Sequence, residues 1–181
     1  MFIGGSSWFF QHPGKGVTFN VMKWRIIPVA LLVLLPLLTK GAGDAPLDRA
    51  TLHGLKAVNI VVDQIDPSIE ELGVTADALE TRLLARLAAA HIQVDRTAGE
   101  FIGFRITSVR GNRGPFALSL TIGLYQPVLL SRDHNVRTST QTWEVESILM
   151  ADPKQVPAAA FETADQLADR FAAAYKLANP E

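Results

Sequence analysis

The sequence of 181 residues contains no cysteine. The chain therefore forms no disulfide, and it has no thiol that ligates zinc, attacks a substrate or receives a lipid anchor. The glycine-rich patterns G-x-G-x-x-G and G-x-x-x-x-G-K-[ST] are also missing, as is the nucleophile pattern G-x-S-x-G. The sequence thus lacks the common local motifs of dinucleotide binding, phosphate binding and serine hydrolysis.

Acidic residues are absent from the first 43 positions. The whole chain has 17 basic and 18 acidic residues, and four of the basic ones lie in residues 1–43, which leaves 13 bases against 18 acids and a net charge of −5 for residues 44–181. An acidic domain without a basic stripe is a poor binder of nucleic acid, and anionic lipid surfaces repel it. We therefore expect no nucleic-acid partner.

A hydrophobic run long enough to span a bilayer is also missing. The longest apolar stretch, residues 26–38, has thirteen residues and two prolines, whereas a spanning helix needs about 20 apolar residues. Lys23 and Arg25 precede it, and the small residues Gly41-Ala42-Gly43 follow it. This order predicts a secretory signal peptide over residues 22–43. An uncleaved membrane anchor is the alternative, and it would be the only contact with a membrane.

The predicted leader sets the boundaries of the chain. Residues 1–21 have no usable periodicity, and we interpret them as an overcalled start upstream of Met22, with a disordered extension as the alternative. Residues 44–54 form a polar lead-in segment, and residues 55–181 form one domain. The protein is therefore predicted to be exported, to the periplasm or the extracellular space.

Periodicity predicts a strand, a helix, four strands and a closing helix. Apolar residues alternate in 55–65, 101–110, 116–130 and 136–150, and a short strand covers 92–95. Leucines recur every four residues in 75–91, after Thr75 as N-cap, and His91 is expected to end this helix in a left-handed conformation. Pro157 suits the first turn of the last helix. Pro127 predicts a strand edge or bulge.

The alternation also separates two faces of the sheet. Apolar side chains from Ile102 to Val145 point to one face, which two helices must cover. Polar side chains such as Arg105, Thr107, Ser119, Thr121 and Tyr125 point to the other face, together with Thr138, Thr140, Thr142, Glu144 and Glu146. The sequence predicts an α+β fold: a single mixed, mostly antiparallel sheet of about five strands with two helices on one face, in the order β-α-β-β-β-β-α.

Four segments together resemble a family of exported bacterial proteins of uncharacterised function, in which one small α/β domain follows a signal peptide. The segments are GVTADALETRLLARLAAAHIQV, LYQPVLLSRD, TSTQTWEVESI and DQLADRFAAAYKLANPE, whose ending F-x3-Y-x3-N-P is the most characteristic. The resemblance runs from about residue 55 to the end and implies the same compartment and a similar fold. His91 departs from it, because the family usually has glycine there. The resemblance implies no activity and no catalytic residues.

The polar sheet face is the strongest candidate site. Arg105, Tyr125, Thr142 and Glu144 are predicted to form a partner-binding platform, since tyrosine and arginine anchor interfaces. The alternative is a small periplasmic hydrolase, whose site would combine Asp63, Asp66, Asp133 and His134. Ligand spacing for calcium or zinc is absent, so we expect no metal and no cofactor.

These features favour a non-catalytic exported envelope protein. It would be a small binding or accessory domain for an unidentified envelope protein or small ligand.

Overall fold

The computed structural model describes residues 43–112 and 114–180. The predicted start at Met22 and nearly all of the predicted leader lie outside these residues. The helices are α1 (Pro46–Ala50), α2 (Pro67–Glu70), α3 (Ala76–Ala89) and α4 (Val156–Ala178), and the strands are β1 (Ala57–Val62), β2 (Gln93–Val94), β3 (Phe101–Arg110), β4 (Phe116–Leu130) and β5 (Asp133–Ala151). None of these helices has the length and apolar character that crossing a membrane requires.

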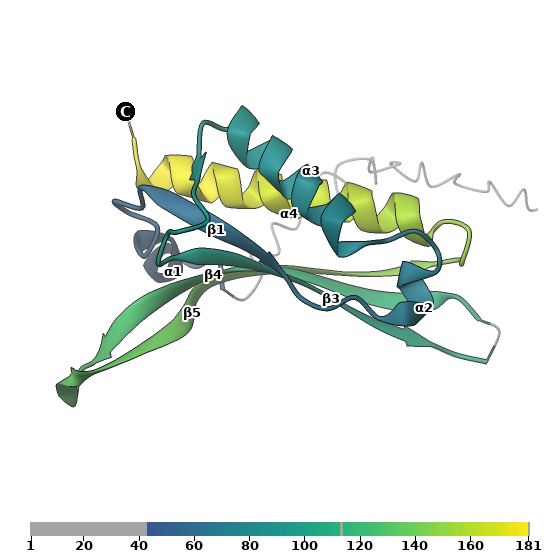
Figure 1. The fold of residues 1–181 in the computed structure, drawn as a ribbon, viewed down its shortest axis with the longest axis horizontal. Coiled ribbons are helices and arrows are strands. Elements are labelled where there is room, and N and C mark those ends of the chain that lie inside the picture. The colour runs from purple at the N-terminus through teal and green to yellow at the C-terminus, as the bar shows by residue number, and fades with distance from the viewer. Residues whose placement is uncertain (1–42, 113, 181) are drawn as a thin grey trace, which may run out of the picture. The chain divides into compact units, whose positions relative to one another are not determined.

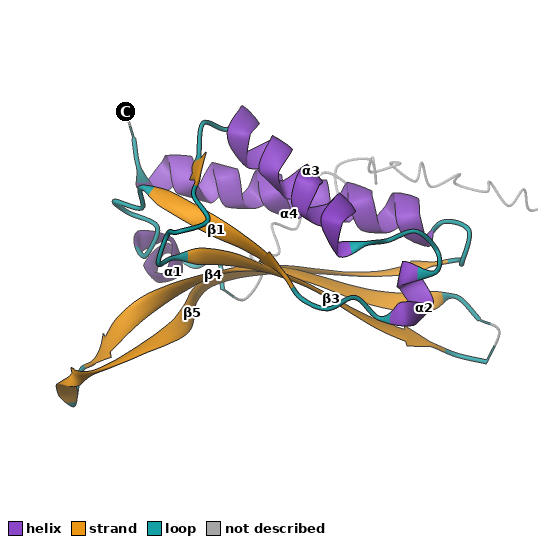
Figure 2. Cartoon of the chain, viewed as in Figure 1, coloured by secondary structure: helices purple, strands orange, loops and turns teal. Residues whose placement is uncertain are grey.

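The strands form one sheet in the order β2-β1-β3-β4-β5. β1 pairs in parallel with β2 and with β3, while β3–β4 and β4–β5 are antiparallel and supply most of the paired residues. Helices α3 and α4 lie together over one face of the sheet (Figures 1 and 2). The predicted fold class is therefore confirmed. The short helices α1 and α2 are additions, in segments whose prolines predicted only irregular structure.

The core lies between the sheet and the two long helices. Alternate residues of β3 and β4 point into it because side chains on a strand change face at every residue. These side chains are almost completely buried, and they include Ile102, Phe104, Leu118, Leu120, Ile122 and Leu124. Leu79, Leu83 and Leu87 of α3 cover them from one side.

The ends of α3 match the local sequence. The Thr75 hydroxyl accepts a hydrogen bond from the Ala78 N–H at 3.3 Å, which satisfies one free donor of the first turn. His91 follows the last turn with φ 62°, the left-handed conformation expected at a helix stop.

The C-terminal motif F-x3-Y-x3-N-P fastens α4 to the segment before β1. Phe171 packs edge-on against Trp143 with ring centroids 5.3 Å apart. The Tyr175 hydroxyl donates to the Leu55 carbonyl at 3.0 Å. The Asn179 side chain accepts from the Gly54 N–H at 2.7 Å and donates to the Leu52 carbonyl at 2.9 Å. The motif therefore has a structural explanation in packing and hydrogen bonding.

The β4–β5 pair continues beyond the rest of the sheet. The last β3–β4 pair is Phe101 with Tyr125, whereas β4 and β5 stay paired to the turn at residues 131–132. Because β3 begins at Phe101, the ribbon of residues 126–140 has no third strand in the described part of the chain, and the register of β4 and β5 shifts between Leu124 and Tyr125. Pro127 lies in this ribbon, on an edge next to a bulge, as its missing N–H predicted.

Candidate functional site

The sheet face opposite α3 and α4 has three rows of paired residues at its centre. Their order across β3, β4 and β5 is Phe101–Tyr125–Gln141, Gly103–Gly123–Glu144 and Arg105–Thr121–Glu146. Two glycines therefore lie side by side in the middle row, between an aromatic row and a charged row. Because neither residue has a side chain, side chains of the aromatic row lie over them.

The Tyr125 ring lies across Gly103. A Cβ added at Gly103 would be 2.8 Å from Cε2 of Tyr125, which is closer than any normal contact. The same ring stacks on Phe101, with centroids 4.8 Å apart and an interplanar angle of 3°. Its hydroxyl donates to Oε1 of Gln141 at 2.9 Å. Tyr125 is thus held flat on the sheet and half-buried, with a defined orientation before any ligand binds.

Arg105 forms an ion pair with the residue that follows β1. Its Nε lies 2.8 Å from Oδ2 of Asp63, and 60% of its side chain remains exposed. This hydrogen bond raises the pKa of the Arg105 guanidinium above its already high value. Because only one guanidinium nitrogen is bound by this contact, the rest of the planar group faces solvent.

A hollow of about 300 Å³ occupies the centre of this face. Its floor contains Gly103 and Gly123, and its walls contain Tyr125, Glu144 and the Asp63–Arg105 pair. Glu144 accepts a hydrogen bond from the Gln141 amide, so that its carboxylate belongs to the same network as the Tyr125 hydroxyl. The hollow therefore offers the stacked rings of Phe101 and Tyr125, two carboxylates and one guanidinium within a single concave surface.

Three of the four predicted platform residues meet at this hollow, and Thr142 does not. The register shift makes Thr142 the extra residue of β5, between Gln141, which pairs with Tyr125, and Trp143, which pairs with Leu124. Its hydroxyl donates to Oε1 of Gln126 at 2.8 Å, and Gln126 in turn contacts the Thr51 carbonyl just after α1. The bulge interrupts the alternation, so Gln141 takes the place that the sequence assigned to Thr142.

The open face is not polar throughout. Towards the end of β3 it presents Val109, Ile148 and Met150, whose exposed fractions are 67%, 73% and 65%. Met150 and Ala117 are paired, and Ala117 is paired with Val109. This apolar end was missed from the sequence, although the alternation of β5 already placed Ile148 and Met150 on the outward side.

The residues of the hydrolase hypothesis do not come together. Asp63 and Asp66 lie in the loop between β1 and α2, whereas Asp133 and His134 occupy the turn end of the β4–β5 ribbon (Figure 1). Within residues 43–112 and 114–180 no group of three metal-ligating side chains lies close enough to hold an ion.

Comparison with known proteins identifies distant likenesses of fold alone. No family model matches the sequence, and no curated protein matches it. One similar solved structure is a PelC dodecamer from Paraburkholderia phytofirmans, with 10% identity, a TM-score of 0.36, and 66% of this chain and 85% of that chain covered. Another is a minor lipoprotein from Acinetobacter baumannii, with 12% identity, a TM-score of 0.30, and coverage of 68% and 92%.

Proposed function

We propose that this chain is a non-catalytic exported envelope protein that binds a partner through the open face of its sheet. The observation on which the proposal rests is the hollow at Gly103 and Gly123, where Tyr125, Glu144 and Arg105 converge on a face that neither long helix covers. Residues that anchor protein interfaces are often a rigid aromatic ring and an arginine whose guanidinium can still form hydrogen bonds. The basic, apolar and small residues of segment 22–43 support export.

A blocking substitution tests the docking surface. Thr121 lines the hollow from the middle of β4 and pairs with Arg105. Thr121→Trp places a large side chain over the hollow with a residue that strands tolerate well. We expect the variant to fold and to lose the partner that the wild-type protein retains from envelope extracts.

The matched control adds the same side chain to the other layer of the molecule. Ala158 is exposed near the start of α4, and Ala158→Trp should leave partner retention unchanged. The proposal is wrong if Ala158→Trp abolishes retention and Thr121→Trp preserves it. Circular dichroism of both variants checks that each keeps the wild-type fold.

A further inference from the structure

β1 leaves β3 before β3 ends. Their last paired residues are Val62 and Phe104, and the Asp63 N–H then donates to the Phe104 carbonyl at 2.8 Å. β3 continues to Arg110 and remains paired with β4 throughout. Among residues 43–112 and 114–180, the second half of β3 therefore has a neighbouring strand on one side only.

The alternation of the strand identifies which backbone groups face the unpaired side. Because the Phe104 carbonyl points towards β1, the even-numbered residues of β3 direct their backbone groups away from β4. The N–H and carbonyl of Ser108 therefore point to the side from which β1 has departed. A strand edge of this kind is a template for an additional strand.

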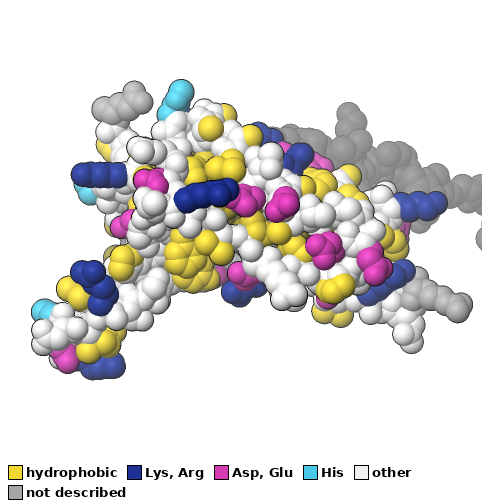
Figure 3. Space-filling model, in the orientation of Figure 1, with side chains coloured by type: hydrophobic (Ala, Val, Ile, Leu, Met, Phe, Trp, Pro, Cys, Tyr) yellow, Lys and Arg dark blue, Asp and Glu magenta, His cyan; other side chains and the backbone are white. Residues whose placement is uncertain are grey.

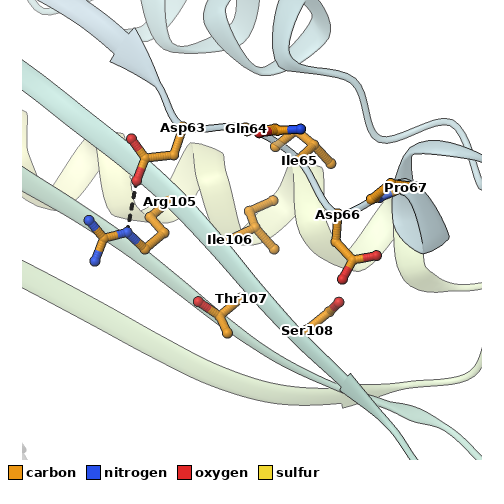
Figure 4. A pocket seen from close by; sticks show the side chains of 9 residues that line it. All are labelled: Asp63, Gln64, Ile65, Asp66, Pro67, Arg105, Ile106, Thr107 and Ser108. Carbon is orange, nitrogen blue, oxygen red and sulfur yellow. Dashed lines mark hydrogen bonds and ion pairs between the residues drawn. The ribbon is translucent and has the colours of Figure 1, made fainter.

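A hollow of about 530 Å³ lies along this edge. Residues 63–67 form one wall and residues 105–108 form the other, as Figure 4 shows. The Asp66 carboxylate faces the Ser108 hydroxyl across it (Figure 4). An extended chain advances about 3.3 Å per residue, so the free stretch of β3 matches a partner strand of about five residues.

The charge around the hollow is negative. Asp63 and Asp66 line it, and two exposed glutamates lie nearby, Glu70 as the last residue of α2 and Glu71 directly after it. The Asp66 carboxylate accepts a hydrogen bond from the Ser68 N–H at 2.8 Å, and bonding to Ser68 lowers the pKa of Asp66. The one arginine in the lining, Arg105, is already paired with Asp63. The surroundings therefore favour a basic occupant.

The outer edge of β5 suits a basic strand less well. The Glu144 N–H on that edge donates to the Gly43 carbonyl at 3.3 Å, so the chain itself covers part of it. Farther along, Arg132 and Arg137 give the ribbon positive charge (Figure 3). The hollow, the unpaired strand edge and the negative charge therefore all lie along the second half of β3.

We infer that an extended, basic segment of a partner protein adds as a strand to the free edge of β3, beside residues 63–67. This inference rests on the proposed binding function and names the class of partner. Main-chain hydrogen bonds to Ser108 hold the segment, and its alternate basic side chains meet Asp66 and the acidic start of α2. The Asp63–Arg105 pair borders both hollows, so this edge site adjoins the site at Gly103 and Gly123.

A defined peptide tests this inference on protein purified from cells that express the full chain. The probe is a capped heptapeptide with lysine at alternate positions between valine and threonine. We expect calorimetry to show binding, and backbone hydrogen exchange at Ser108 to slow by about tenfold at saturation. A peptide with glutamate in place of lysine should bind about tenfold more weakly.

Two variants separate the main-chain and charge contributions. Ser108→Pro removes the N–H donor at an edge position that tolerates proline, and it should weaken binding by about tenfold. Asp66→Asn removes the charge but keeps a good N-cap for α2, and it should weaken binding about threefold. A lysine peptide that is N-methylated on its edge-facing residues tests the same hydrogen bonds with the wild-type protein, should Ser108→Pro fail to fold.

The outcomes distinguish this inference from the proposed function. Equal binding of the N-methylated peptide, or exchange protection on β5 in place of Ser108, overturns strand addition at β3. If Thr121→Trp still abolishes retention of the envelope partner in that case, the sheet-face function stands and the edge inference alone is wrong. Retention of the partner by Thr121→Trp, together with tight peptide binding at β3, rejects the sheet face and keeps the edge.

Discussion

The carboxylate of Asp44 accepts a hydrogen bond from the indole Nε1 of Trp143, with 3.1 Å between Oδ1 and Nε1. Trp143 is buried in the core. The same carboxylate forms an ion pair with Arg49, whose Nε lies 2.7 Å from Oδ1. A residue immediately after the predicted leader is therefore bound to the centre of the domain. This contact orders the segment that enters α1.

Replacing Asp44 should destabilise the fold in a pH-dependent way. Burial raises the pKa of Asp44, but the hydrogen bonds from Arg49 and Trp143 outweigh it and leave the pKa below its ordinary value. Asp44→Ala should lower the free energy of unfolding by about 1–3 kcal/mol at neutral pH. A carboxylate with a lowered folded-state pKa stabilises the protein above its unfolded pKa of about 3.9, and this contribution disappears as the pH falls through the folded value.

Urea denaturation at several pH values measures this dependence. The free energy of unfolding of the wild type should exceed that of Asp44→Ala by a constant amount above a pH of about 5. This difference should become smaller below a pH of about 4. Glu71→Ala, at an exposed position after α2, is the control, and a difference that persists unchanged into acid would contradict a charged hydrogen bond.

Gly103 should resist substitution more than its neighbour Gly123. A side chain at Gly103 displaces the Tyr125 ring and breaks its stack on Phe101, whereas at Gly123 it meets the amide end of Gln141, 2.7 Å away, which is hydrogen-bonded to Tyr125 and Glu144 but moves more easily than a stacked ring. We expect Gly103→Ala to cost about 1–2 kcal/mol, as overpacking does, and Gly123→Ala to change stability by less than about 0.5 kcal/mol. Chemical denaturation and the near-ultraviolet circular dichroism of Tyr125 report the two effects. Equal costs would show that the ring does not lie on Gly103.

Asn179 should contribute more to stability than an end-of-helix residue normally does. Its side chain bonds the Gly54 N–H and the carbonyls of Leu52 and Tyr175. Asn179→Ala should therefore cost about 1–3 kcal/mol, because these partners lose hydrogen bonds in a half-buried region. The exposed Lys176→Ala is the matched control on the same turn of α4, and thermal melting compares them. An unchanged melting temperature for Asn179→Ala would mean that water replaces the amide.

Elements with a local cause were predictable from the sequence, and features that depend on distant pairing were not. The leucines of α3 and the alternation of β4 follow from one element's own geometry. The hollow depends on Gly103 pairing with Gly123 across two strands, and nothing within either strand signals that register. The place of Thr142 was mispredicted for the same reason, since a bulge is invisible to a two-residue period. Tyr125 was predicted on the right face, but its burial depends on Gly103.

Arg82 and Arg86 illustrate the same limit on the helical side. Helical spacing placed them away from the leucine stripe, and both are indeed exposed, with side-chain exposed fractions of 42% and 43%. Each also lies 2.9 Å from Oδ2 of Asp165 on α4. Burial raises the pKa of Asp165, but the hydrogen bonds from Arg86 and Arg82 lower it overall. The two arginines therefore link α3 to α4 through ion pairs, which helical spacing alone does not predict.

Reversing both charges should loosen the contact between α3 and α4. Arg82→Glu with Arg86→Glu should lower the urea midpoint of unfolding only modestly, because solvent screens the exposed guanidinium groups. High salt should shrink this effect, since the screening length falls to about 3 Å at 1 M. Adding Asp165→Arg to the double variant should restore part of the loss. Denaturation curves at low and high salt test this prediction. If the urea midpoint falls by the same amount at both salt concentrations, the cause is lost packing and not lost charge pairing.

The β4–β5 ribbon beyond Gln126 and Thr140 should be dispensable for folding. Its turn end bears Arg132 and Arg137 together with exposed Leu129 and Val136 (Figure 3). Two strands without a third, or a covering helix, are marginally stable in water. Replacing residues 127–139 with Asn-Gly joins two residues that already pair, through a turn whose twist suits a hairpin.

We expect the shortened protein to keep its free energy of unfolding to within about 1 kcal/mol, because few apolar contacts are removed. The control shortens the ribbon further, from residue 125 to residue 141, and thereby removes the Tyr125 ring from Gly103 and Phe101. Urea denaturation should show a clearly lower free energy of unfolding for this control and not for the first deletion. If the first deletion already costs as much as the second, the ribbon packs on the domain in solution and belongs to its core. If it costs nothing, the length of the ribbon serves a purpose other than stability, and retention of the envelope partner by the shortened protein measures whether that purpose is binding.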